Sequence, residues 1–274
     1  MIDNEKNIAF WDLAAQQSEK NRKAFAGMLM EGREFEALYR CRAEQEHLLK
    51  MFSPTHETRV LEVGSGGGRW GFFFADKVGA YVGLDLSPKM VDIAEAERVR
   101  RNLPNVRFEC CDFLQFDEKE KFDLVYFSGV LQYMDDAVVA QCIARASGVL
   151  SEGGIIISRD SVQTAERVEK TGEYPVVYRL EAEYRAIFEA GGYDLQYSDL
   201  SYEHKRFTGL AARLYDIPGV TYGIAYAFRE ALCRVDDMLG NPGFLKTRKH
   251  KRLMKQENPQ EHKFFKYARK KSDT

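Results

Sequence analysis

A glycine cluster directly after a short apolar strand constrains this chain more than any other feature. Residues 59–63 read Arg-Val-Leu-Glu-Val, and residues 64–68 read Gly-Ser-Gly-Gly-Gly. Glycines at a strand-to-helix turn let the backbone approach a ligand closely, and the helix behind them presents free N–H groups. The pattern predicts a strand, a ligand-binding loop and a helix, in that order.

The spacing of these glycines separates two classes of ligand. Gly64, Gly66 and Gly68 form a GxGxG pattern, whereas the dinucleotide fingerprint GxGxxG needs glycine at position 69, which is Arg69. An acidic residue at position 62 also departs from that fingerprint, and the phosphate-binding pattern GxxxxGK[ST] is absent. A nicotinamide dehydrogenase is therefore disfavoured.

Strands and helices alternate after this loop, which predicts an α/β fold with a doubly wound, mainly parallel sheet. Ser87-Pro88 provides an N-cap oxygen and a proline at the first helical position. The expected strands are 59–63, 80–85, 105–110, 122–128, 155–158 and 193–200, and the expected helices are 88–101, 136–150 and 180–190.

The two ends of the chain differ from this alternating middle. Residues 4–52 read as helices, residues 221–239 as one amphipathic helix, and residues 263–269 as a final strand. We therefore expect an N-terminal helical cap at 1–54, a core formed by 55–202 plus 261–271, and a helical insertion at 203–260. This insertion and the cap are expected to form a lid or substrate wall.

Polar and small residues follow the predicted strands where a parallel sheet places its ligands. Asp85 ends the second strand, 21 residues after Gly64, where a carboxylate can accept the hydroxyls of a ribose. It could instead be a helix N-terminal charge ahead of Ser87-Pro88. Asp112 and Phe113 follow the third strand. Asp112 could bind the exocyclic amine of a purine, and Phe113 could flank the face of its ring. Ser128 follows the fourth strand.

The ordered set E-V-G-S-G-G-G, L-D-L-S-P-K-M, C-D-F and F-D-L-V-Y-F-S-G-V-L resembles the class I S-adenosylmethionine-dependent methyltransferases. The resemblance covers about residues 35–200 plus the last strand. It implies a Rossmann-like sheet of seven strands with a reversed final hairpin, and S-adenosylmethionine as cofactor. The chain departs from the simplest members because about sixty residues separate its last two strands.

The resemblance also implies which residues bind the cofactor. The methionine part is expected at the glycine loop, the ribose at Asp85, the adenine beside Leu86, and the sulfonium above Ser128. The full set of implied cofactor contacts is Glu62, Gly64, Ser65, Gly66, Gly68, Asp85, Leu86, Asp112, Phe113 and Ser128.

Methyl transfer requires alignment of a nucleophile and, for a hydroxyl or a protonated amine, a base. His204 follows the sixth core strand and Asp160 follows the fifth, so both are candidate bases; a surface position is the alternative for His204. Tyr133 could flank the cofactor or the acceptor, or serve only packing. Arg40 or Arg42 could reach the cofactor carboxylate.

The expected acceptor is small and polar, and it takes the methyl group on oxygen or nitrogen. The strand at 122–128 is followed neither by Asn/Asp-Pro-Pro-Tyr nor by Pro-Cys, which disfavours nucleic-acid bases. A sugar, a nucleotide sugar or a glycan fits this description. Two alternatives stay open: an RNA or protein methyltransferase that uses the basic segment 246–255, and a cofactor-binding protein without catalysis.

The charge distribution and the cysteines bear on partners and compartment. The chain has 40 basic and 42 acidic residues, yet residues 246–274 hold eleven basic and three acidic ones. An anionic surface could therefore contact Lys246–Lys255. The five cysteines form no CxxC pair and suggest no metal site, and no apolar run is long enough to span a membrane. A cytoplasmic location is expected, and homo-oligomerisation is left open.

Overall fold

The computed structural model describes residues 2–21, 34–202, 207–238 and 260–270, and a single sheet organises them. The described part contains nine strands in the order β3-β2-β1-β4-β5-β7-β6, with β9 pairing β5 and β8. The strands are β1 Arg59–Val63, β2 Ala80–Asp85, β3 Val106–Cys110, β4 Phe122–Ser128, β5 Leu150–Gln163, β6 Val168–Lys170, β7 Val176–Leu180, β8 Tyr193–Leu200 and β9 Gln260–Arg269.

The predicted α/β architecture is confirmed. Strands β3, β2, β1, β4 and β5 pair in parallel, as expected from crossovers through helices. β9 lies antiparallel between β5 and β8, so the expected reversed hairpin is present despite the long connection between β8 and β9.

The sheet is larger than the expected seven strands because residues predicted as a loop form a hairpin, β6–β7. β7 pairs in parallel with the end of β5, at Val162 and Gln163. The prediction of β5 stopped at Ser158 because the apolar run ends there; the polar residues 159–161 continue the strand. The extension carries β5 beyond the end of β4 and builds one wall of the cavity described below.

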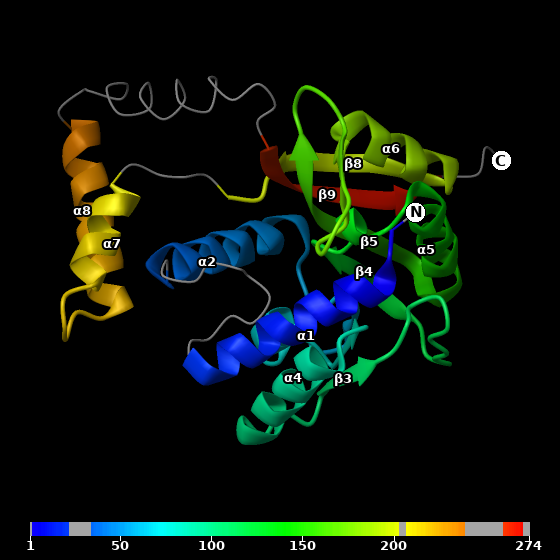
Figure 1. The fold of residues 1–274 in the computed structure, drawn as a ribbon, viewed down its shortest axis with the longest axis horizontal. Coiled ribbons are helices and arrows are strands. Elements are labelled where there is room, and N and C mark those ends of the chain that lie inside the picture. The colour runs from blue at the N-terminus through cyan, green and yellow to red at the C-terminus, as the bar shows by residue number, and fades with distance from the viewer. Residues whose placement is uncertain (1, 22–33, 203–206, 239–259, 271–274) are drawn as a thin grey trace.

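Helices cover both faces of the sheet (Figure 1). α2, α3 and α4 pack on one face, and α5 and α6 pack on the other. The helices are α1 Asn4–Asn21, α2 Glu34–Met51, α3 Arg69–Phe74, α4 Pro88–Arg100, α5 Asp136–Val149, α6 Glu181–Ala190, α7 Thr208–Tyr215 and α8 Tyr222–Met238, with a 3₁₀ turn at Leu131–Tyr133.

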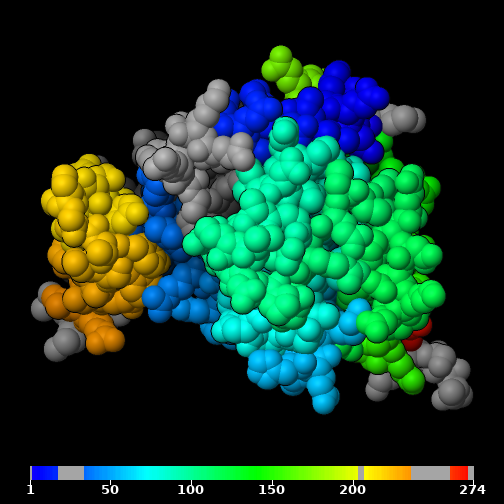
Figure 2. All heavy atoms as spheres, turned by 90° about the horizontal axis from the view of Figure 1, so that it is seen from below, coloured from blue at the N-terminus to red at the C-terminus, as the bar shows by residue number. Residues whose placement is uncertain are grey.

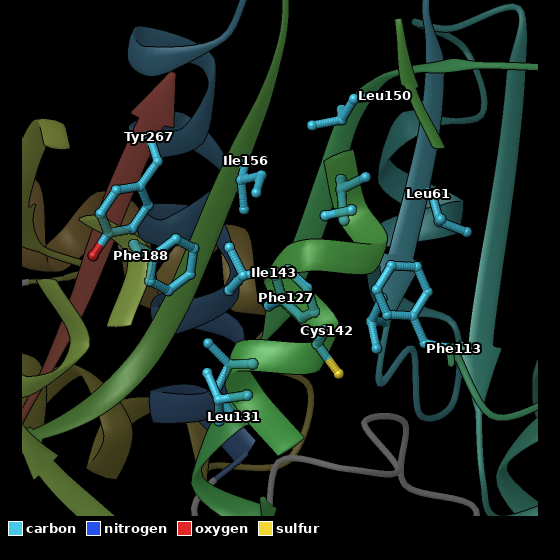
Figure 3. Packing of buried hydrophobic residues seen from close by; sticks show 14 of the residues in the cluster. Leu61, Phe113, Phe127, Leu131, Cys142, Ile143, Leu150, Ile156, Phe188 and Tyr267 are labelled. Atoms are coloured by element: carbon cyan, nitrogen blue, oxygen red, sulfur yellow. The ribbon is translucent and has the colours of Figure 1, made fainter. Parts of the chain in front are cut away.

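The core between the sheet and helices α5 and α6 is continuous (Figure 3). It runs from Phe113 and Phe127 to Phe188 on α6 and Tyr267 on β9. The rings of Phe188 and Tyr267 stack at 3.8 Å with an interplanar angle of 6°. This packing holds the last strand against the sheet, so the residues on its other face have fixed positions.

α7 and α8 form a lobe beside α2 (Figure 2, yellow and orange). A separate apolar cluster joins Phe35 and Tyr39 on α2 to Ala211 and Ala225. Residues 203–206 and 239–259 of the predicted insertion lie outside the described residues. No described helix is long and apolar enough to cross a membrane.

Candidate active site

A cavity of about 480 Å³ lies at the carboxyl ends of β1, β2 and β4. The loops after β1, β2, β3 and β4 form one part of it, and α1, β5, β7 and β9 form the other. This volume is in the range of sites for small ligands and cofactors. Its position is where parallel α/β sheets place their ligands.

Gly64, at the start of the glycine loop, is held against its neighbours without room for a side chain. Gly64 has a φ of +79°, and a Cβ atom at this position would lie 2.6 Å from Cβ of Val130. Its N–H and that of Ser65 donate to the carbonyl oxygen of Leu84, at 2.8 and 2.9 Å. The loop therefore presents its backbone to the cavity at the end of β1.

Gly68 has another role than the one implied by the resemblance. It does not line the cavity, and a Cβ atom there would lie 2.7 Å from the Phe108 ring. With a φ of +82°, it starts α3 and allows the helix to pack against β3. The requirement for glycine is therefore one of packing.

Asp85 joins the glycine loop to the loop after β2. Its Oδ2 accepts a hydrogen bond from the Gly66 N–H at 2.7 Å, and its Oδ1 accepts one from the Ser87 N–H at 2.9 Å. Burial raises the pKa of Asp85, and these two hydrogen bonds oppose the rise. A carboxylate has lone pairs beyond these two contacts, so it can also accept the hydroxyls of a ribose in the cavity.

Glu62 and Ser128 form the floor beneath the glycine loop. The Tyr81 hydroxyl donates to Glu62, which is 1% exposed, and the Trp70 indole N–H donates to Ser128 Oγ at 2.8 Å. Burial raises the pKa of Glu62 to about 8, against the hydrogen bond from Tyr81. Both residues line the cavity, as expected. When ionised, Glu62 can pair with an ammonium group above it.

The predicted adenine contacts also meet at one end of the cavity. Leu86, Asp112 and Phe113 line it, and Asp112 Oδ1 accepts a hydrogen bond from the Leu114 N–H at 2.9 Å. Phe113 packs edge-on against Phe127. A planar ring bound beside Phe113 could thus donate a hydrogen bond from its edge to the carboxylate of Asp112.

Several buried polar atoms of the cavity wall have no hydrogen-bond partner among the described residues. They are both amide atoms of Asn7, the hydroxyl of Ser65 and the amide oxygen of Gln132. Buried polar groups are normally hydrogen-bonded, so unpaired ones in a cavity indicate a polar ligand. A molecule with ribose, amino and carboxylate groups fits this wall and the residues described above.

Aromatic side chains close the cavity above β4. Tyr133 follows β4 and hydrogen-bonds through its hydroxyl to that of Tyr174, in the β6–β7 turn. Trp11 of α1 packs edge-on against Tyr133 at 5.8 Å. Burial raises the pKa of Tyr133 well above its ordinary value, so its phenol remains protonated at neutral pH. Tyr133 can donate or accept a hydrogen bond there, but it is not a phenolate base.

Strands β5, β7 and β9 add a second polar wall. It is lined by Arg159 and Ser161 of β5, Tyr178 of β7, and Gln260 and His262 of β9. Ser161 Oγ lies 3.1 Å from Nδ1 of His262, its cross-strand neighbour. This histidine therefore lines the cavity next to a hydroxyl group.

The structure places one of the predicted bases, Asp160, away from the cavity. Asp160 is fully buried and does not line the cavity, because its neighbours Arg159 and Ser161 occupy the cavity-facing positions of β5. Side chains alternate along a strand, so Asp160 points to the opposite face. His204 lies outside the described residues. Of the predicted lid, α1 and Gln260 line the cavity and residues 207–238 do not; Tyr174 and Tyr178 of the β6–β7 hairpin line it as well.

Sequence reasoning missed His262 and Arg159. The final strand was expected to begin at residue 263, whereas β9 begins at Gln260. The alternation of His262, Phe264 and Lys266 was a usable signal, because Phe264 is buried on the face that carries His262. Arg40, one of the two arginines proposed for the cofactor carboxylate, lines the cavity, whereas Arg42 pairs with Glu46 on the surface.

A family model described as a methyltransferase domain matches residues 54–199, more than half of the chain. The chain belongs to the methyltransferase domain family. This membership confirms the resemblance to S-adenosylmethionine-dependent methyltransferases and with it the cofactor S-adenosylmethionine.

Known methyltransferases share parts of this domain. Phosphoethanolamine N-methyltransferase 1 of Arabidopsis thaliana is 29% identical over 149 residues, which are 53% of this chain and 30% of that protein. The chain thus spans about a third of the length of this relative.

Two solved structures show the same fold at lower identity. Phosphoethanolamine N-methyltransferase 1 of Haemonchus contortus, in complex with phosphoethanolamine and S-adenosylhomocysteine, is 15% identical with a TM-score of 0.60. That likeness covers 97% of this chain and 49% of the other. A DhpI–SAH complex is 20% identical with a TM-score of 0.55, covering 72% of this chain and 91% of that one.

Proposed function

We propose that this methyltransferase-domain protein transfers a methyl group from S-adenosylmethionine to an oxygen or nitrogen atom of a small polar acceptor. The observation that carries the proposal is one cavity that joins the cofactor residues around Asp85 to the polar wall around His262. The volume of about 480 Å³ suits a cofactor and a small partner better than a macromolecule.

The protein's own residues would align the acceptor and exclude water. S-adenosylmethionine supplies an activated methyl group when bound. Tyr133 and Trp11 cover the cavity from above, and Arg159 and Ser161 border the acceptor position. His262 is the one histidine among the described residues of the cavity wall, and an imidazole held by Ser161 can take the proton that the acceptor releases.

An amine-bearing acceptor has support from the cavity wall and from the relatives. Trp11, Tyr133, Tyr174 and Tyr178 all line the cavity, and aromatic rings attract ammonium groups. Two of the similar proteins carry the name phosphoethanolamine N-methyltransferase. Phosphoethanolamine is therefore the first acceptor to test, followed by sugars, nucleotide sugars and glycans. The RNA or protein alternative rests on residues 246–255, which lie outside the described residues.

The test is a transfer assay with labelled S-adenosylmethionine against a panel of these acceptors and against RNA and protein fractions. We expect S-adenosylhomocysteine to form with one small acceptor, whose mass grows by one methyl group. Label that enters only RNA or protein would contradict the proposal, as would the absence of transfer to every fraction of a cell extract.

A pair of histidine variants tests the proposed base. His262→Asn should lower kcat by about 10²-fold or more while the affinity for S-adenosylhomocysteine stays unchanged. The rate should also lose the rise with pH that a titrating imidazole imposes. His56→Asn is the matched control, because His56 is exposed before β1 and does not line the cavity. An unchanged kcat in His262→Asn would remove His262 from the chemistry.

A further inference from the structure

Three arginines converge on one buried carboxylate at the cavity wall. Glu44 on α2 is fully buried; its Oε1 accepts from Arg40 Nε and Arg159 Nε, both at 2.9 Å, and its Oε2 from Arg69 Nη1 at 2.8 Å. These residues come from α2, α3 and β5. We call Arg40, Arg69 and Arg159 the arginine cluster.

The charges of this cluster do not balance. Guanidinium groups keep their protons, so three positive charges face the single carboxylate of Glu44. Burial alone would raise the pKa of Glu44, but Arg40 and Arg69 outweigh it and hold that pKa below its usual value. Glu62, the next carboxyl group on this side, has a pKa of about 8 and adds no full charge at neutral pH. Buried charges are normally paired, so the cluster has an unmet need for an anion.

The unpaired charge faces the cavity. All three arginines line it, and their side chains are only 8% to 16% exposed. Arg159 Nε and Nη2 both lie 2.9 Å from Glu44 Oε1. Nε donates a hydrogen bond to it, whereas the buried Nη2 is not aligned for one. Its third nitrogen, Nη1, lies 3.4 Å from the position of a Cβ atom on Gly129, the residue after β4.

The carboxylate of the cofactor can neutralise only one of these charges. Arg69 follows the glycine loop directly, so it is the member of the cluster nearest in sequence to the predicted methionine position. The cofactor also brings an ammonium and a sulfonium, which add positive charge. Arg159, on the acceptor side beside Ser161 and Gly129, shares the single carboxylate of Glu44 with two other guanidinium groups, so the cluster can still take a second anion there when the cofactor is bound.

We propose that Arg159, supported by Arg40, binds an acidic group of the methyl acceptor, a phosphate or a carboxylate; this rests on the proposed function. Guanidinium nitrogens bind both groups through charge-assisted hydrogen bonds. The acceptor thus carries an anionic group a short distance from the atom that receives the methyl group. A neutral sugar or a simple amine lacks the group that this wall selects.

Anion binding can be measured without turnover. Inorganic phosphate and acetate are titrated into the protein saturated with S-adenosylhomocysteine, and binding is followed by ³¹P line broadening and by the thermal midpoint. We expect saturable binding of one or both anions, and the stronger one identifies the acidic group. If neither anion binds to the saturated protein, the proposal is wrong.

Variants of the cluster separate the acceptor from the cofactor. Arg159→Gln should weaken anion binding tenfold or more and change the S-adenosylhomocysteine affinity by less than threefold; Arg159→Lys should restore part of the anion affinity. Arg42→Gln, on the same helix as Arg40 but outside the cavity, should change neither. If Arg159→Gln does not fold, the same two affinities, for the anion and for S-adenosylhomocysteine, are measured for Arg40→Gln.

Three further outcomes separate the anion site from the proposed function. An equal loss of cofactor affinity in these variants, with unchanged anion binding, would assign the cluster to the cofactor carboxylate and overturn the proposal. With active protein, phosphoethanolamine should have a KM at least tenfold below that of ethanolamine, and equal KM values would overturn it as well. Anion binding together with no methyl transfer to any acceptor would count against the proposed function and leave the anion site standing.

Discussion

The backbone N–H of Gly66 donates to the Asp85 carboxylate at 2.7 Å, so the loop after β1 and the end of β2 form one unit. The two residues are 19 positions apart, and the sequence patterns that carry them were recognised separately. The contact shows how the carboxylate has two roles: it holds the loop in place and faces the cavity. Variants of Asp85 should therefore affect both the loop and the ligand.

Replacing Asp85 by Asn should weaken the binding of S-adenosylhomocysteine by about 10- to 100-fold. The amide removes the charge and one of the acceptor oxygens that hold Gly66 and Ser87, and such hydrogen bonds to charged groups contribute about 1–3 kcal/mol. Calorimetric titration measures the change. Asp92→Asn, on the exposed side of α4, is the control and should bind as the wild type does. Equal affinities in the two variants would contradict the role of Asp85.

Replacing Gly64 by Ala should abolish cofactor binding and lower the free energy of unfolding. The new methyl group would lie 2.6 Å from Val130 Cβ, in addition to the strain of a φ of +79°. Gly219→Ala separates the two effects, because Gly219 has a φ of +87° and no atom within 4 Å of the added Cβ. We expect a loss of about 1 kcal/mol in the control and a larger loss in Gly64→Ala, both measured by urea unfolding. Similar losses of unfolding free energy in the two variants would show that the Val130 side chain moves to accommodate the new methyl group.

Replacing Glu44 by Gln should destabilise the protein by about 3 kcal/mol or more, because it leaves three buried guanidinium groups without their carboxylate. Glu46→Gln is a matched control on the same helix. Its pair with Arg42 has the same four-residue spacing but is about half exposed, so the loss should be within about 0.5 kcal/mol. Denaturant unfolding compares the two, and equal losses would mean that the arginine cluster does not depend on Glu44.

Asp160 should make stability fall as pH rises from about 4 to about 7. Burial raises the pKa of Asp160 to about 7, whereas the unfolded chain releases this proton near pH 3.9. Between these values the folded state binds a proton that the unfolded state does not, so each pH step costs stability, and the cost is constant above pH 7.

The variant Asp160→Asn should remove this dependence. Its stability relative to the wild type should grow through the pH window by a few kcal/mol, at about 1.4 kcal/mol per pKa unit. Asp194→Asn, exposed on β8, is the control. Unfolding curves at four pH values give the comparison. Parallel pH profiles for the wild type and Asp160→Asn would show that Asp160 titrates normally.

The parts of the fold with continuous apolar strands were predictable. The strands at 59–63, 80–85, 122–128 and 193–200 have the expected bounds, because turn residues or charged residues flank each of them. β6 and the second half of β5 were not predictable from apolar runs, because β6 has only three residues and residues 159–161 are polar. β7 does begin with an apolar pair, Val176-Val177, but its place in the sheet comes from pairing with β5 and β6.

The part of the cavity at the ends of β1 and β2 was predictable from local motifs, and the wall around Arg159 was not. Local motifs identified Asp85 and the glycine loop, which both line the cavity. In contrast, Arg159 meets Glu44 across 115 positions, and no local pattern records such a pairing. The choice of Asp160 as a base was wrong because a run of polar residues does not show which of them face the cavity. Neighbouring residues of β5 point to opposite faces, so Arg159 and Ser161 line the cavity and Asp160 lies in the core.

Calorimetric titration of the wild-type protein with S-adenosylmethionine, and in parallel with NAD, tests the central claim most directly. We expect one binding site for S-adenosylmethionine and no heat with NAD, because Gly64, Asp85 and Glu62 line the cavity and Arg69 stands where the dinucleotide fingerprint needs glycine. Absence of binding heat for S-adenosylmethionine at several temperatures, or binding of NAD in its place, would contradict it.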